Sequence, residues 1–62
     1  QLTERETEVL RYIAKGMTLP ETARLLGISA HTISGYVKNI YRKLNISSRA
    51  EAAMTARNLG LI

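Results

Sequence analysis

The sequence predicts an all-α fold, a single domain of four helices over residues 1–62. Its apolar residues recur at spacings of three and four and do not alternate, which is the period of a helix and not of a strand. Each helical stretch is preceded by a Ser or Thr that can cap it. A chain this short buries only about 60% of the surface that its unfolded form exposes, so it has no room for a deep active site.

The first helix is expected over residues 4–14. Thr3 and Glu6 form a capping box, in which a hydroxyl and a carboxylate pair with free backbone amides at the helix start. Gly16 ends the helix, because glycine tolerates the left-handed conformation that follows a helix C-terminus. The side that faces the core is expected to carry Val9, Leu10 and Ile13.

The second helix is expected over residues 19–26. Thr18 and Glu21 repeat the capping box, and Pro20 stands in the first turn, where its missing N–H costs nothing. The residues that this helix is expected to bury are Ala23 and Leu26.

A break of three residues, Gly27, Ile28 and Ser29, leads to a third helix, expected over residues 30–44. Gly27 turns the chain, Ile28 can fill the space between the helices, and Ser29 can cap the third. Because the break is so short, the two helices meet at a sharp angle. This arrangement is typical of a helix-turn-helix, whose second helix enters the major groove of DNA. Any small helical hairpin has the same spacing, so the pattern alone leaves both interpretations open.

The third helix has two different faces, given a turn of about 100° per residue. One arc is apolar and is expected to face the core. The opposite arc is basic, has small side chains and is expected to face a polyanion. The apolar arc holds Ile33, Val37, Ile40 and Leu44, and the basic arc holds His31, Gly35, Lys38 and Arg42.

The positive charge is concentrated in the second half of the chain. Acidic and basic residues cancel over residues 1–28, and this local basicity is typical of a phosphate-binding footprint. A solvated basic surface without a function is the alternative that charge alone leaves open. The net charge of +4 comes from Lys38, Arg42, Lys43, Arg49 and Arg57 less Glu51.

Lys38 is expected to read a base or the phosphate beside it, because it lies mid-helix and has a long side chain. Ser34 and Gly35 lie on the same approach. A glycine inside an exposed helix costs about 0.5–1 kcal/mol relative to alanine, so its presence favours close approach of the backbone to DNA. Simple tolerance of the glycine is the alternative.

Other polar residues of this helix are expected to hold the DNA backbone. Thr32 can donate to a phosphate, together with the free amides and the positive dipole end of the helix, unless it only contacts Ser29. Arg42 and Lys43 are expected to bind phosphates, or else to act as favourable charges at a helix C-terminus. His31 lies near the helix start, within reach of phosphate or base.

A fourth helix is expected over residues 49–59, opened by a third capping box, Ser48 with Glu51. Its small residues make it apolar over more of its circumference than one core requires. One side can then serve a second copy of the chain, in a weak homodimer that matches two-fold DNA half-sites. Alanine as a good helix former is the alternative explanation. The expected dimer residues are Ala50, Ala52, Ala53, Met54, Ala56 and Arg57.

The composition argues against an enzyme, a metal site and a cofactor. The chain has no Asp and no Cys, its one histidine is His31, and its glutamates are expected at helix starts or on exposed faces. The absence of Cys fits a reducing cytosol, and we expect a cytoplasmic protein. No apolar run approaches the roughly 18 residues of a membrane span, so we expect no membrane partner. The chain starts at Gln1, directly before a helix signal, and we expect an excised domain of a longer protein.

The chain resembles the LuxR-type, or NarL/FixJ-type, C-terminal DNA-binding domain over essentially its whole length. The segments that carry the resemblance are LTERETEVL, AKG, TARLLGIS, HTISGYVKNIYRKL, ISSRAEA and GLI. The resemblance implies a four-helix helix-turn-helix domain whose third helix enters the major groove and whose fourth mediates dimerisation. It also implies a linked receiver or small-molecule-sensing domain, which this chain does not contain.

By position, the resemblance places a phosphate contact on Thr32 and groove-reading roles on Ser34, Gly35 and Lys38. The chain departs from the family where Ser34 replaces a common Lys, and where Leu19 and Pro20 replace a polar pair. More of the affinity is therefore expected from Lys38 and the amides of the third helix.

The sequence thus predicts sequence-specific binding of double-stranded DNA by the output domain of a bacterial transcription regulator, a response regulator of a two-component system. The alternative from another class is a protein-interaction module that docks through residues 49–59. Salt-dependent retention on DNA separates the two, since a pure interaction module shows little. A basic amphipathic membrane binder is a weaker third, because the core needs the apolar stripe of the third helix.

Overall fold

The computed structural model describes residues 1–62 and contains four helices and no strand, which confirms the all-α prediction. The first three helices have the expected bounds. The fourth ends one residue early, because Leu59 is its C-terminal cap. None of the helices combines the length and the apolar character needed to cross a membrane. The helices are α1 (Glu4–Ala14), α2 (Leu19–Leu26), α3 (Ala30–Leu44) and α4 (Arg49–Asn58).

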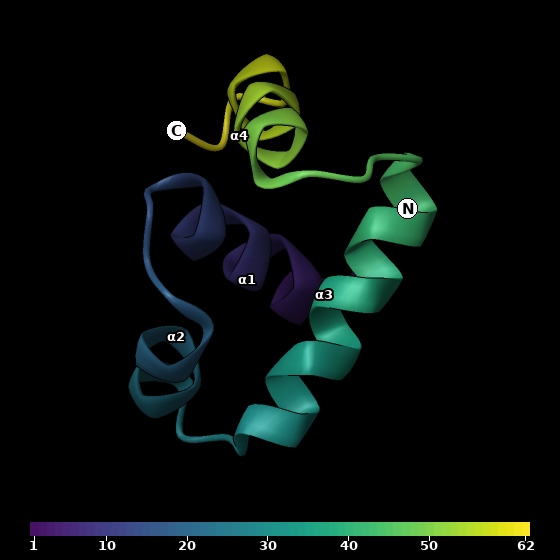
Figure 1. Cartoon of the computed structure of the whole chain (residues 1–62). Coiled ribbons are helices and arrows are strands. Elements are labelled where there is room, and N and C mark those ends of the chain that lie inside the picture. Colours follow the sequence, from purple (N-terminus) through teal and green to yellow (C-terminus); the bar gives the residue numbers. More distant parts are fainter.

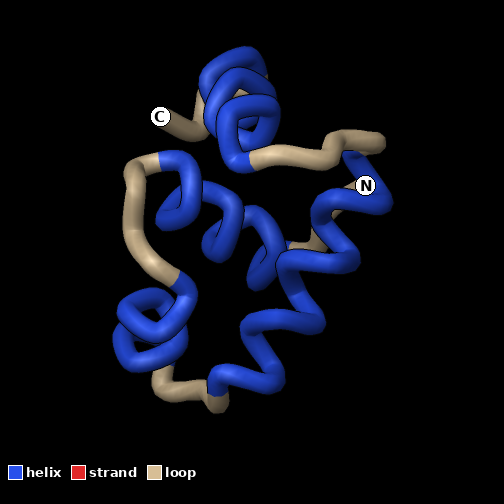
Figure 2. The backbone as a smooth tube through the Cα atoms, viewed as in Figure 1, coloured by secondary structure: helices blue, strands red, loops and turns tan.

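The helix α1 lies at the centre of the bundle, between α4 and α2, with α3 alongside (Figure 1). It packs against each of the other three helices, and α2 also packs on α3. In contrast, the backbones of α3 and α4 hardly approach each other. The connectors are short, and the one after α2 brings α2 and α3 to a sharp angle (Figure 2). The arrangement is that of a helix-turn-helix held on a central helix.

The first two helices begin with the expected capping boxes. The Thr3 hydroxyl accepts from the Glu6 amide at 3.1 Å, and the Glu6 carboxylate accepts from the Thr3 amide at 2.8 Å. The same reciprocal pair joins Thr18 and Glu21. These bonds satisfy amides that a helix start otherwise leaves unpaired.

The start of α4 differs from the predicted capping box. Ser48 Oγ accepts from the Glu51 amide at 3.2 Å, as expected. The Glu51 carboxylate, however, accepts from the amide of Ser47 and not from that of Ser48. The φ of Ser48 is −145°, against −73° at Thr3, and this rotation turns its N–H away from the carboxylate. Only half of the predicted box is therefore present.

The core lies between α1 and the inner faces of α3 and α4. On α2 the prediction was partly wrong, because Leu26 is only half-buried while Thr22 is fully buried. The Thr22 hydroxyl donates to the Thr18 carbonyl at 2.9 Å, so its burial leaves no unpaired polar group. Ala23 is buried as predicted. The fully buried apolar residues are Val9, Leu10, Ile33, Ile40, Ala52 and Ala56.

Candidate nucleic-acid interface

One side of α3 is exposed along the length of the helix. We call this side the outward face of α3, and its exposed residues are His31, Thr32, Ser34, Gly35, Lys38 and Arg42. On the opposite side, Ile33 and Ile40 are fully buried, and Val37 and Leu44 are half-buried. The predicted division of this helix into a core face and a solvent face is confirmed. The core face anchors α3, so the outward face is free to meet a partner.

The turn between α2 and α3 fixes where α3 begins. Gly27 has a φ of 70°, a left-handed conformation that glycine adopts without strain. Ile28 follows it, half-buried and packed on the core. Ser29 then caps α3 by accepting from the Thr32 amide at 3.1 Å. The start of α3 is thereby held in one position against the body of the domain.

The side chain of Thr32 makes the local contact that the sequence left open as its alternative role. Its hydroxyl lies 2.9 Å from the Ser29 hydroxyl. Both residues are exposed, and the contact engages one hydroxyl group with another rather than burying either. The Thr32 hydroxyl therefore lies at the helix start with further hydrogen-bonding capacity.

Gly35 is not required by the packing of the domain. Apart from its chain neighbours and the adjacent backbone of α3, a Cβ added at this position meets no atom within 4 Å, and the residue lies in regular helix with no left-handed φ. The conformational freedom and small size of glycine are thus not used within the fold. Because Gly35 has no side chain, the backbone of α3 is uncovered at this point of the outward face, one turn before Lys38.

The two long cations of the outward face differ in their surroundings. Lys38 belongs to neither of the two ion pairs of the protein, which are Arg5–Glu8 and Lys43–Glu6. Arg42, one turn later, donates from Nη2 to Oδ1 of Asn39. A guanidinium has five N–H donors, so most of those of Arg42 stay available.

Lys43 is placed differently from the sequence expectation of a phosphate contact. Its Nζ lies 2.8 Å from Oε1 of Glu6, across the interface between α3 and α1. Glu6 lies at a helix start, as predicted, but its side chain is only 4% exposed, a burial that was not predicted. A buried carboxylate needs a counter-charge, and Lys43 supplies it.

The bonds to Glu6 favour its ionised form. The Lys43 ammonium and then the Thr3 amide hold the pKa of the Glu6 carboxyl below its ordinary value, and burial opposes them only in part. The sequence contained a signal for this burial. Glu6 lies on the same helical face as Val9, Leu10 and Ile13, at the i, i+3, i+4 and i+7 spacing of the core stripe.

Arg49, another of the excess cations, is also tied within the fold. Its Nη2 donates to the carbonyl of Ile13, in the last turn of α1, at 3.4 Å and to that of Met17, in the connector that follows α1. No sequence pattern joins residues this far apart in the chain. The basic footprint of the second half is therefore smaller than the net charge indicates.

The residues expected to form a dimer surface on α4 divide between two sides of the helix. Ala52 and Ala56 are 0% exposed and belong to the core against α1, so the prediction was wrong for them. They lie four residues apart, and so on one face of α4, which packs on α1. Ala53 is half-buried. The outward face of α4 comprises Ala50, Met54 and Arg57, with Met54 60% exposed.

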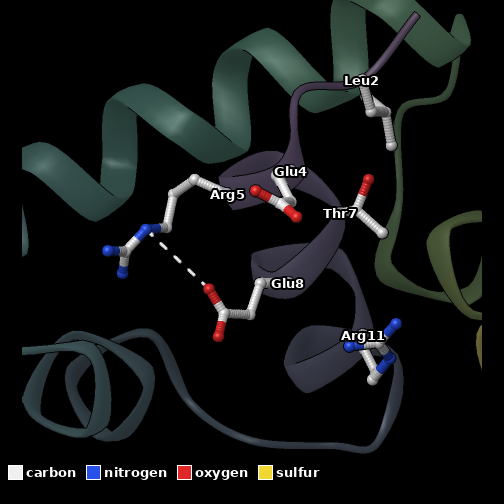
Figure 3. A pocket seen from close by; sticks show the side chains of 6 residues that line it. All are labelled: Leu2, Glu4, Arg5, Thr7, Glu8 and Arg11. Atoms are coloured by element: carbon white, nitrogen blue, oxygen red, sulfur yellow. Dashed lines mark ion pairs between the residues drawn. The ribbon is translucent and has the colours of Figure 1, made fainter.

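The larger surface hollow of the domain lies on α1, and none of its lining residues belongs to α3. Its volume is about 700 Å³, and only one lining residue is apolar. Figure 3 shows Arg5 directed toward Glu8, with 3.8 Å between Nε and Oε1. A charged depression of this kind lacks the apolar walls of a small-molecule pocket. The lining residues are Leu2, Glu4, Arg5, Thr7, Glu8 and Arg11.

Comparison with known proteins identifies the family of this domain. The family of bacterial regulatory proteins described as the luxR family matches residues 1–56. The chain belongs to the LuxR family. This LuxR-family chain is accordingly a helix-turn-helix DNA-binding domain of the transcriptional regulator type, and the family is not one of enzymes.

Several curated relatives align over nearly the whole LuxR-family domain. The HTH-type transcriptional regulator MalT of Vibrio campbellii is 43% identical over 58 residues, which are 94% of this chain and 6% of that protein. The transcriptional activator protein AnoR of Acinetobacter nosocomialis is 39% identical over 61 residues, 98% of this chain and 26% of that protein. The HTH-type quorum sensing-dependent transcriptional regulator VjbR of Brucella ovis is 44% identical over 61 residues, 98% of this chain and 24% of that protein. The domain thus spans about a quarter or less of these relatives.

Proposed function

We propose that this LuxR-family domain binds specific sequences of double-stranded DNA with α3 in the major groove. The observation that carries the proposal is the outward face of α3, which is exposed, basic and has small side chains at Ser34 and Gly35. The opposite face of the same helix is fixed in the core. A major groove about 12 Å wide admits one helix, and base edges there are read by donors on its exposed side. Family membership supports the same use of this helix.

Within this interface, Lys38 reads a base edge or the phosphate beside it. It is exposed and free of ion pairs, and it lies one turn after Gly35, where no side chain covers the backbone of α3. Ser34 and Gly35 let the backbone of α3 approach the groove floor. With no competing acceptor inside the protein, the Lys38 ammonium is available to an acceptor on DNA such as O6 or N7 of guanine.

The two ends of α3 bind phosphates of the DNA backbone on either side of the groove. At the start, Thr32 and the helix amides donate to one phosphate, supported by the positive end of the helix dipole. Farther along, Arg42 binds another, and His31 adds a contact near the start. We assign Lys43 to Glu6 and not to DNA, since removing its ammonium would leave a buried carboxylate without its partner.

Two copies bind together through the outward face of α4, as a weak homodimer on paired half-sites. Met54 supplies the apolar centre of this face, and Ala50 and Arg57 lie beside it. A patch with one large apolar side chain buries little area, so the pairing is expected mainly on DNA. The half-sites then lie about one helical turn apart.

The domain is the output end of a larger cytoplasmic regulator. We propose that a linked receiver domain, phosphorylated as in a response regulator, controls it. The names of the curated relatives do not favour this choice, because one is called quorum sensing-dependent and none is called a response regulator. A small-molecule-sensing domain is the competing input. Phosphotransfer to the complete regulator from a small phosphodonor distinguishes them, since only a receiver accepts the phosphoryl group.

The DNA-binding proposal is tested by selection from a random duplex pool, followed by titration at several salt concentrations. We expect the selected duplex to bind more tightly than a scrambled one of equal length, with log K falling linearly in log salt. Salt-independent retention, or equal affinity for selected and scrambled duplexes, contradicts the proposal. The first of these results favours a protein-interaction module that docks through α4, whose outward face exposes Met54.

A further inference from the structure

The orientation of α4 relative to α3 is set almost entirely through α1. Both helices pack on α1, and their backbones hardly approach each other. The chain between them, residues 45–48, contains no helix. A helix held in this way would pivot about the connector if its attachment to α1 loosened. The geometry that relates the DNA-reading helix to the dimer helix therefore depends on what ties each of them to α1.

Two basic side chains tie the ends of this connector to opposite ends of α1. Just before the connector, Lys43 Nζ lies 2.8 Å from Oε1 of Glu6, in the first turn of α1. Just after it, the Arg49 guanidinium donates to the carbonyls of Ile13, in the last turn of α1, and Met17, just beyond α1. We call these the Lys43 clamp and the Arg49 clamp.

The two clamps join different kinds of groups to α1. The Oε1 atom of Glu6 also accepts from the Thr3 amide at 2.8 Å, and the side chain is 4% exposed, so the carboxylate cannot move toward water. The Arg49 guanidinium is planar and rigid, and it carries positive charge at the negative end of the α1 dipole. Each clamp thus resists a different rotation of the segment between α3 and α4.

We infer that Lys43 and Arg49 are positioning residues that fix α4 relative to α3, and thereby set the spacing of the two DNA half-sites that a pair of copies can bind. The inference rests on the proposed function, in which α3 reads DNA and α4 pairs two copies. In a two-fold pair, a tilt of α4 displaces the partner's α3 along the DNA, because the two reading helices are joined only through the α4 contact. A rigid attachment demands one spacing, and a loose attachment accepts several.

The test measures affinity against half-site spacing. A half-site duplex recovered by selection is presented once, or as two inverted copies whose centres are separated by about 8 to 13 base pairs in single steps, bracketing one helical turn. Arg49→Met removes the donors of the Arg49 clamp and keeps aliphatic length. Lys15→Met is the matched control, because Lys15 is exposed, lies outside both clamps and carries the same charge.

We expect wild type and Lys15→Met to prefer one spacing by about tenfold over spacings two base pairs away, as geometric matching of two linked sites predicts. In Arg49→Met this preference falls to about twofold, while affinity for the single half-site matches that of Lys15→Met within about twofold. Arg49→Lys, which keeps a donor able to reach one carbonyl, lies between them. A loss of structure alone would lower single-site and paired binding together, so the split between the two readouts identifies positioning.

A second variant keeps the test decisive if Arg49→Met does not fold, as judged by circular dichroism. Glu6→Gln combined with Lys43→Gln replaces the ion pair by neutral amides that still hydrogen-bond, and we expect a broadened spacing profile. An unchanged profile in every folded clamp variant overturns the inference and leaves specific DNA binding standing. Wild type that binds single half-sites without any spacing preference overturns it together with paired binding. Failure of wild type to bind any duplex at low salt instead rejects the proposed function itself.

Discussion

Two pairs of basic residues in the second half of the chain have opposite structural roles. Lys38 and Arg42 lie on the outward face of α3, exposed and without a carboxylate partner. Lys43 and Arg49 are bonded to α1, one to a buried carboxylate and the other to backbone carbonyls. The net charge counts all four residues equally, whereas in the structure Lys43 and Arg49 have partners on or just after α1 and Lys38 and Arg42 do not.

Helical register explains part of this difference. Lys38 and Arg42 are four residues apart and share a face, while Lys43 lies about 140° around the helix from Lys38. That rotation carries Lys43 from the outward face of α3 to the side that faces α1, where Glu6 is buried. Basic residues of one helix should therefore be assigned to a partner by their angle and not by their proximity in sequence.

The largest expected effect on binding comes from removing a free cation. Lys38→Ala is expected to cost about 1–3 kcal/mol of binding free energy on the selected duplex if the ammonium reads a base edge. The Tm is expected to stay at the wild-type value, because Lys38 has no partner within the fold. Fluorescence anisotropy with selected and scrambled duplexes measures both affinities. An equal loss on the two duplexes would reassign Lys38 to a phosphate.

Removing a bonded cation is expected to act on stability instead. Lys43→Met leaves the Glu6 carboxylate buried without its counter-charge, so the Tm falls by several degrees. The slope of log K against log salt stays at the wild-type value, because no phosphate contact is lost. Arg42→Met is the matched control on the same helix, and it is expected to reduce that slope by about 0.9 with little change in Tm. Equal slopes for the two variants would abolish the distinction between the pairs of cations.

A smaller effect is expected at Gly35, where substitution raises the stability of the fold and weakens DNA binding. Gly35→Ala removes the helix penalty of glycine, and the new methyl group meets no atom of the domain beyond the adjacent backbone of α3, so unfolding becomes harder by about 0.5–1 kcal/mol. Binding to the selected duplex is expected to weaken, because the methyl group occupies space in the groove. Thermal denaturation and anisotropy measure the two quantities. Wild-type affinity in this variant would mean that the glycine is only tolerated.

The smallest expected effect is a difference in acid sensitivity. The pKa of Glu6 is lowered from 4.5, mainly by Lys43, so folding favours its ionised form. A carboxyl of this kind stabilises the fold above its unfolded pKa, and the contribution is lost as the pH falls through the lower folded value. The Tm of wild type should therefore decline below about pH 4.5, and it should decline less in Lys43→Met. Arg42→Met should follow wild type, since the Arg42 side chain bonds to Asn39 and not to Glu6.

The helix boundaries were readable from the sequence because local chemistry determines them. Thr3, Thr18, Ser29 and Ser48 each cap the helix that follows, and the bonds involve residues only three apart. The two faces of α3 were readable for a similar reason, since strong contrast between apolar and basic residues defines them. Local bonds and strong periodicity are what a single sequence records well.

The clamps and the inner face of α4 were not readable in the same way. Arg49 bonds to carbonyls 32 and 36 residues earlier in the chain, and nothing local marks that contact. In α4, alanines occupy both the inward and the outward side, so the periodicity has little contrast and does not tell Ala52 and Ala56 from Ala50. Glu6 is a different case, because its spacing to Val9, Leu10 and Ile13 places it on the core stripe and marks its burial in the sequence.

Nuclear magnetic resonance of the 62-residue domain with a selected duplex tests most directly that the outward face of α3 is the DNA-binding surface. We predict the largest shifts of amide and side-chain resonances at Thr32, Ser34, Gly35 and Lys38, with the charged hollow on α1 unaffected. The Lys43–Glu6 pair should persist in the complex. Shifts that concentrate on Ala50 and Met54 while α3 stays silent would contradict the account and would show that the domain engages its partner through α4.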